Sequence, residues 1–150
     1  MQVELAKRMM DACYQAKRIR ELLPVLPEGV TASHIHYLDV IETLEQKGRR
    51  AKISDISDAL QLPRPGVTRT VKEMEAKGYI QKASSEEDGR ITYLTVTEAG
   101  RALSGKYNRQ CFDRLTSYLK DIPEEDVEIM IRTIGRVHQV MCERRIHLED

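Results

Sequence analysis

The feature that most constrains the fold of this sequence is a short helical segment, a proline-rich connection and a second, amphipathic helical segment in immediate succession. In the first segment, Ser54 can cap a helix and Asp55 places an acid in its first turn. The connection Pro63-Arg64-Pro65-Gly66 leads into the second, where Pro65 suits the first helical position because its missing N–H costs nothing there. The apolar residues of this second helix recur on one side: Val67, Val71 and Met74. The opposite side of this second helix is therefore free to contact a binding partner.

The two segments after this helix predict a β-hairpin. Residues 79–83 and 91–96 are rich in β-forming side chains, and the polar loop between them contains the turn pair Asp88-Gly89. A short helix, a tight turn, an amphipathic helix and a hairpin, in this order, form a winged helix-turn-helix. Its second helix fits the major groove of DNA, which is about 12 Å wide. The centre of the chain therefore predicts a DNA-binding module.

Helical patterns flank this centre on both sides. Apolar residues recur at helical spacing over residues 5–23, and a second helix has Thr31 as its cap and Gly48 at its end. After the hairpin, Thr97 caps a helix of about six turns and Pro123 opens a final one. We therefore expect a mainly α fold with a small β-hairpin wing, in which a winged helix-turn-helix core is flanked by long helices.

The distribution of charge supports the DNA-binding prediction, although the total does not. The formal net charge is zero, whereas sequence-independent DNA binding depends on cations that neutralise phosphates. Between residues 47 and 82, however, nine Lys and Arg residues stand against four Asp and Glu residues, and acids gather toward the C-terminal end. The centre of the chain is therefore the part that tolerates phosphate.

Eight residues are the candidates for DNA contact: Arg64, Pro65, Gly66, Thr68, Arg69, Lys72, Asp88 and Arg90. Gly66 permits close approach, Thr68 can reach a phosphate or a thymine methyl group, and Arg69 can hold guanine or phosphate. Arg90, at the end of the hairpin loop, suits a narrow minor groove, with Asp88 holding it in place. Which of these residues read bases stays open.

The same segments resemble the MarR family. The resemblance is carried by residues 53–60, residues 67–80, Asp88-Gly89-Arg90 and the run from Leu94 to Gly100, and it covers nearly the whole chain. Its most specific parts are the Asp-x-Arg wing and the Leu-x-Val-Thr-x-x-Gly run. The reading helix is the second helix of the helix-turn-helix, which would enter the major groove. At its start the family usually has a small hydroxyl residue, whereas this chain has Arg64-Pro65. The N-terminal cap of this helix is therefore lost or supplied by another group.

The resemblance implies an obligate homodimer whose first and last helices intertwine. It assigns residues 1–30 and 101–150 to dimerisation and residues 31–100 to DNA binding. It also implies that the dimer binds double-stranded DNA at a pseudo-palindromic operator, with repression released by a small, often aromatic, effector or by an oxidant. No cofactor is expected. The candidates for an effector pocket are His36, Tyr37, Tyr107 and Cys111. The tyrosines and Cys111 otherwise fill the core, and His36 otherwise lines a dimer seam.

Three alternatives stay open. Cys13 lies near the place where peroxide-sensing members of the family have their reactive cysteine, so that the protein is alternatively a thiol-based redox sensor. A winged-helix protein-interaction module without DNA binding is the second alternative. A metal site would need ligands from two helices, and none is assigned; the residues considered are His34, His36, His138, His147 and Cys142.

Other classes of protein find no support in the sequence. It has no Gly-rich phosphate loop, nucleophile elbow or metalloprotease motif, so that we do not expect an enzyme. No apolar run approaches the roughly 20 residues that cross a bilayer, and the N-terminus lacks the apolar stretch of a secretory signal. We therefore expect a cytoplasmic protein without a membrane partner. The three cysteines are odd in number and widely spaced, which argues against a disulfide framework.

Overall fold

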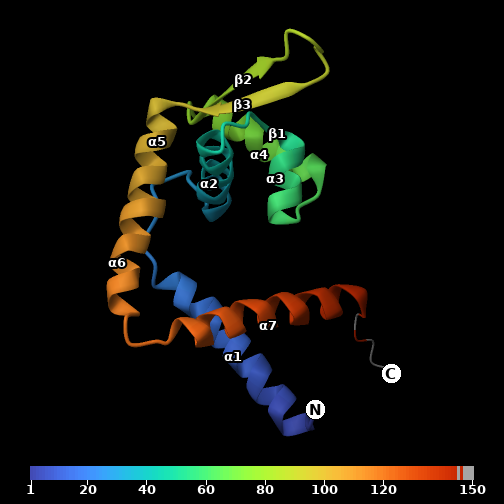
Figure 1. Cartoon of the computed structure of the whole chain (residues 1–150), viewed down its shortest axis with the longest axis vertical. Helices are drawn as coiled ribbons and strands as arrows, with labels where there is room; N and C mark the ends of the chain where they lie inside the picture. The colour runs from blue at the N-terminus through green and yellow to red at the C-terminus, as the bar shows by residue number, and fades with distance from the viewer. Residues whose placement is uncertain (145, 147–150) are drawn as a thin grey trace. The chain divides into compact units, whose positions relative to one another are not determined.

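Helices and one small sheet make up the computed structural model, which describes residues 1–144 and residue 146 (Figure 1). The helices are α1 (Val3–Glu21), α2 (Ala32–Gln46), α3 (Ile53–Leu60), α4 (Arg64–Ala76), α5 (Glu98–Ser104), α6 (Cys111–Tyr118) and α7 (Glu124–Glu143), with a π-helical segment, η1 (Gly105–Gln110), between α5 and α6. The strands are β1 (Ala51–Lys52), β2 (Ile80–Ser84) and β3 (Thr92–Val96). The chain divides into two compact units, residues 1–111 and the residues from Phe112 on.

Among the residues that the structure describes, no helix has both the length and the apolar character that crossing a membrane requires.

The sheet is antiparallel and has the strand order β1-β3-β2. Ile80 pairs with Val96 and Ser84 with Thr92, and the hairpin projects beyond the helices as a wing (Figure 1). This confirms the predicted hairpin. The third strand, β1, pairs through Ala51 with Leu94 and was not predicted, because two residues give no alternating pattern. It ties the start of the helix-turn-helix to the wing.

The core lies where α2, α3 and α4 meet the sheet. Its largest side chains without solvent exposure are Leu38, Ile41, Ile56, Val67, Val71, Met74 and Leu94. The three apolar residues predicted to form the buried stripe of α4 are all among them, which confirms that stripe. Close packing on this side fixes the direction of α4, so that its opposite side is presented in a defined way.

The helix ends follow local rules, with one correction. The Thr31 hydroxyl accepts a hydrogen bond from the His34 N–H at 3.4 Å, and Gly48 ends the same helix with a φ of 71°, as predicted. Ser54 was predicted to cap α3, and this is wrong. The helix begins at Ile53, two residues earlier than a Ser54 cap implies, and the Asp55 carboxylate accepts from the Lys52 N–H at 2.8 Å. A charged acceptor makes the stronger bond to a helix N-terminus.

The helix after the wing begins as predicted but is not regular. The Thr97 hydroxyl accepts from the Gly100 N–H at 3.1 Å, which confirms the cap. The prediction of one unbroken α-helix of six turns is wrong, because residues 105–110 form the π-helical segment η1. The polar contacts of this segment with α2, described below, are tertiary, and the apolar periodicity of the sequence carries no sign of them. The last helix begins at Glu124 after Pro123, as predicted.

Candidate nucleic-acid interface

Helix α4 has one packed side and one exposed side. Arg64, Pro65, Arg69 and Lys72 are exposed, and Gly66 and Thr68 are half-buried near its N-terminal end. The structure thus brings together on one helix the six residues that the sequence predicted there. Among the described residues, none of the four α4 and wing cations Arg64, Arg69, Lys72 and Arg90 forms an ion pair. Their charges are therefore available to a ligand.

The start of α4 needs no side-chain cap. The helix begins at Arg64, so that Pro65 occupies its second position, not the first as predicted, and contributes no N–H. The next two N–H groups, of Gly66 and Val67, donate to the Pro63 carbonyl at 3.1 and 3.2 Å. These two backbone hydrogen bonds take the place of the cap expected from the family's small hydroxyl residue. The Thr68 hydroxyl donates to the Arg64 carbonyl at 3.0 Å.

The wing loop is held by its own polar groups. The Ser85 hydroxyl accepts from the N–H groups of Glu87 and Asp88, both at 3.3 Å, and the Ser85 N–H donates to the Ile91 carbonyl at 2.8 Å. The Asp88 carboxylate accepts from the backbone N–H of Arg90 at 3.0 Å. We predicted that Asp88 holds Arg90, and the contact is with the backbone and not with the guanidinium group. The loop is ordered while the Arg90 side chain is exposed.

Three contacts that the sequence did not predict join α4 to the wing. The Lys82 ammonium of β2 lies 2.7 Å from the Glu75 carboxylate of α4. The Thr97 hydroxyl donates to the Gly78 carbonyl at 2.6 Å, and the Thr97 N–H donates to the Tyr79 carbonyl at 3.0 Å. All three link the end of α4 to the base of the hairpin, and no periodic pattern signals them. They connect the end of the helix to the base of the wing.

His34 occupies a buried site behind α4. It is 1% exposed, and its Nδ1 accepts from the Thr31 N–H at 3.2 Å. Its Nε2 has no hydrogen-bond partner among the described residues and lies 3.8 Å from the Glu73 carboxylate. Burial lowers the pKa of His34 below its usual value, against the opposing effect of the Glu73 charge, so that the ring is neutral at pH 7. With one nitrogen used by the helix cap, His34 serves the packing of α2 on α4.

The other candidate residues differ in their surroundings. Tyr37 is 2% exposed in the core, and Tyr107 packs against the edge of that core. His36 is exposed, with its Nε2 3.4 Å from an Arg20 guanidinium nitrogen. Cys111 and Cys13 are half-buried. No group of three His, Cys, Asp or Glu side chains in the described part of the chain is arranged to hold a metal, and His147 lies outside the described residues.

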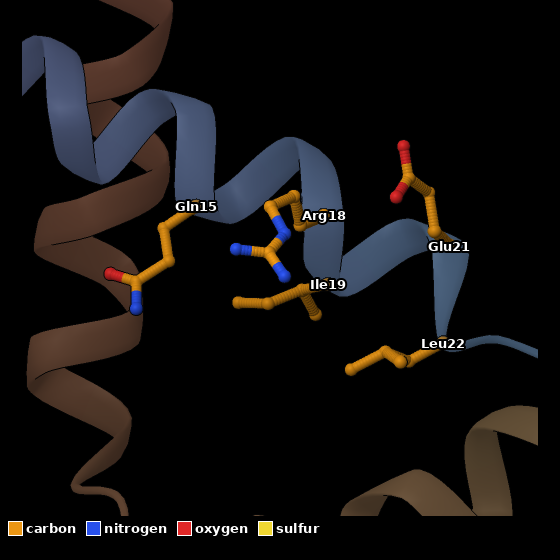
Figure 2. A pocket seen from close by; sticks show the side chains of 5 residues that line it. All are labelled: Gln15, Arg18, Ile19, Glu21 and Leu22. Carbon is orange, nitrogen blue, oxygen red and sulfur yellow. The ribbon is translucent and has the colours of Figure 1, made fainter.

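A hollow lies beside the end of α1 (Figure 2). Its lining consists of Gln15, Arg18, Ile19, Glu21 and Leu22. All five belong to the last turns of one helix and its cap, so that the hollow is open to one side. None of the residues predicted for an effector pocket lines it.

Comparisons with known proteins point to one family. A family model described as the MarR family matches residues 28–91, the segment that contains α2, β1, α3, α4, β2 and the wing loop. The chain is similar to the uncharacterised HTH-type transcriptional regulator YdgJ of Bacillus subtilis, with 25% identity over 129 residues that span 85% of this chain and 77% of that protein.

Two further relatives are similar over shorter segments. The HTH-type transcriptional regulator BilQ of Clostridioides difficile is 28% identical over 74 residues, which are 49% of each chain. The transcriptional repressor MprA of Escherichia coli is 27% identical over 103 residues, 65% of this chain and 57% of that protein. The match thus spans only about half the length of these two relatives. All three relatives are transcriptional regulators and not enzymes.

Solved structures share the fold. FabT of Streptococcus pneumoniae, in complex with DNA, has a TM-score of 0.67 and 21% identity, and the match covers 95% of this chain and 99% of that one. PcaV of Streptomyces coelicolor, in complex with its natural ligand, has a TM-score of 0.64, 18% identity and coverages of 90% and 89%. A MarR/EmrR family regulator from Acinetobacter has a TM-score of 0.68, 18% identity and coverages of 96% and 100%. These likenesses confirm the predicted fold class.

Proposed function

We propose that this chain is a transcriptional regulator of the MarR family, which it resembles in sequence and fold, and that it binds double-stranded DNA as a homodimer and represses transcription until a small molecule releases it. The observation that carries this proposal is the exposed cationic side of α4, whose other side is fully buried, next to an ordered wing. The exposed cationic side of α4 does not contribute to the packing of the core. Its shape and charge fit DNA.

Helix α4 is the proposed reading helix. Its 13 residues give it a length of about 20 Å, enough to lie in the major groove. Its first turn contains no acid, so that the positive end of the helix dipole meets phosphate without opposition. Small side chains at Pro65 and Gly66 let this end approach closely, while Arg69 and Lys72 supply contacts to base edges or phosphates.

Two copies of the chain are proposed to bind together because three helices lack a covered apolar face. Helices α1, α6 and α7 have no buried residue in the described structure. The apolar residues predicted for one face of α7 are exposed or half-buried: Val127, Met130, Ile131, Ile134, Val137 and Met141. A protein in water rarely leaves such a continuous apolar face uncovered. A symmetric dimer covers it and presents two reading helices to two half-sites.

Release by a small molecule is the second part of the proposal. PcaV, which shares this fold, was solved with its natural ligand, so that the fold has room for one. The residues considered for the site are still His36, Tyr37, Tyr107 and Cys111. The effector is therefore sought by adding candidate phenolic compounds to the DNA-binding measurement described next and recording a loss of affinity.

Binding to duplex DNA is expected to weaken steeply with salt. The duplex is selected from a random pool by the protein itself, and its affinity is then titrated over a range of salt concentrations. A dimer offers eight of the proposed cationic contacts, four from each copy. If half of them neutralise a phosphate, log K against log[salt] has a slope of about −3.6. No selected duplex, or a flat dependence, would contradict the proposal and favour a protein-interaction module.

Arg90→Ala is expected to weaken binding of the selected duplex by roughly tenfold to a hundredfold, because its guanidinium group is exposed at the end of a wing loop whose backbone is held by hydrogen bonds. Fluorescence anisotropy titrations of both proteins measure the change. Arg90→Lys serves as the matched variant: it keeps the charge and loses the planar fork, and so separates attraction to a narrow groove from recognition of a base. Equal affinity of Arg90→Ala and the original protein would remove the wing from the interface.

A further inference from the structure

A buried carboxylate lies at the junction of α2 with α5 and η1. Glu42 of α2 is 6% exposed, and the Ser104 hydroxyl donates to its Oε2 at 2.5 Å. The guanidinium groups of Arg101 and Arg109 lie 3.7 and 3.8 Å from its Oε1. A carboxylate removed from water needs such partners, because an unpaired buried charge is strongly unfavourable. Glu42 therefore holds residues from both α5 and η1 against α2.

A second set of contacts holds η1 itself. The Asn108 side-chain amide donates to the Ile35 carbonyl of α2 at 3.3 Å and lies 3.0 Å from the Ser104 hydroxyl. Gly105 opens the segment without a side chain, and an added Cβ would lie 3.0 Å from the Arg109 guanidinium. The glycine thus leaves the space that Arg109 needs to reach Glu42.

These contacts account for the π-helical form of η1. A π-helical turn accommodates an extra residue in an otherwise α-helical run and is less favourable than α-helix unless tertiary contacts hold it. In η1, Asn108 and Arg109 are both bound to α2, directly or through Glu42. Return to a regular α-helix would rotate these side chains away from α2.

The position of η1 in the chain gives this network a role. The first compact unit ends at Cys111, directly after η1, and the second begins at Phe112. We propose that Glu42 and Asn108 are positioning residues for DNA binding: by holding η1 in its π-helical form, they fix the direction in which the chain leaves the winged-helix unit. In a dimer, that direction sets the separation of the two reading helices. This inference rests on the proposed DNA-binding function.

The central variant deletes Gln110, an exposed residue at the end of η1 that takes no part in the network. Losing one residue rotates the following helix by about 100° and moves it by about 1.5 Å. Gln110→Ala is the matched control, because it changes the same side chain without changing the register. Asn108→Ala is the second variant, which removes the amide that bonds to α2 and leaves the chain length unchanged. Light scattering and circular dichroism verify that each variant is a folded dimer.

Two kinds of duplex are compared: the selected duplex with half-sites moved closer or farther by single base pairs, and the same duplex with one half-site scrambled. The deletion is expected to lose about a hundredfold in affinity for the original spacing, because simultaneous engagement of two sites fails when geometry forbids it. Affinity for the single half-site should not change, and the preferred spacing should shift. Asn108→Ala should broaden the spacing preference, and Gln110→Ala should behave as the original protein.

A role in stability alone predicts something different. It would lower affinity for every duplex in parallel and leave the preferred spacing unchanged, and that result for a folded dimer overturns the inference. If the deletion fails to fold or to dimerise, Asn108→Ala decides the question. An Asn108→Ala variant that keeps the original spacing preference then also overturns the inference. If the unaltered protein binds neither kind of duplex, the proposed function itself has failed.

Discussion

Gly100→Ala is expected to destabilise the protein by about 3 kcal/mol or more, as overpacking against a backbone atom does when the side chain has nowhere to move. Gly100 lies at the first turn of α5, where a methyl group would come closer than van der Waals contact to the Tyr79 carbonyl oxygen and within 2.8 Å of Val96 Cγ1. The carbonyl cannot yield easily, since it accepts the Thr97 N–H that joins α5 to the end of α4. Urea unfolding followed by circular dichroism measures the loss.

Gly66→Ala is the control for this substitution. An added Cβ at position 66 meets nothing within 4 Å, and the residue lies within helix α4. Alanine is favoured over glycine inside a helix by about 0.5–1 kcal/mol, so that this variant should be slightly more stable than the original. Opposite signs for the two substitutions would show that steric contact at position 100 matters, whereas an unfolding curve of Gly100→Ala that coincides with the original would refute the expectation.

Ile134→Glu is expected to convert a dimer into monomers and to lower affinity for a two-half-site duplex by about a hundredfold to ten-thousandfold. Ile134 lies at the middle of the apolar face of α7 and is 45% exposed in the single chain. A carboxylate on that face would be transferred out of water when a second copy covers it, which is strongly unfavourable without a partner. Analytical ultracentrifugation reports the mass, and anisotropy reports the affinity.

Gln139→Glu adds the same charge to the opposite face of α7, where the side chain is exposed. We expect this variant to remain dimeric, apart from the loss of a hydrogen bond from Gln139 to Glu143. Should the two variants dimerise equally well, α7 has no part in the interface and the apolar faces of α1 and α6 become the remaining candidates.

Much of the winged helix-turn-helix could be predicted because the sequence patterns that indicate it are local. The stripe Val67, Val71 and Met74 follows the helical period, and the two β-forming segments around Asp88-Gly89 follow turn chemistry. Both descriptions depend only on residues close together in the chain. The caps supplied by Thr31 and Thr97 were predictable for the same reason.

The parts that were missed depend on residues far apart in the chain. Strand β1 exists because Ala51 meets Leu94, and η1 exists because Asn108 meets Ile35. No window of the sequence contains both partners of either contact. The contacts of charged groups were also predicted less well than the burial of apolar ones. A carboxylate such as that of Asp88 can accept a hydrogen bond from a backbone N–H or from a side chain at nearly the same spacing along the sequence.

The ordered backbone of the wing has a consequence for the thermodynamics of binding. Fixing a mobile loop on contact with DNA costs about 1–2 kcal/mol of conformational entropy for each residue. The bonds made by Ser85 and Asp88 fix this loop before any contact forms, so that entering a groove immobilises little beyond the Arg90 side chain. A substitution that frees the loop, such as Asp88→Ala, would therefore appear in calorimetry as a less favourable binding entropy, although the cation that meets the DNA is unchanged.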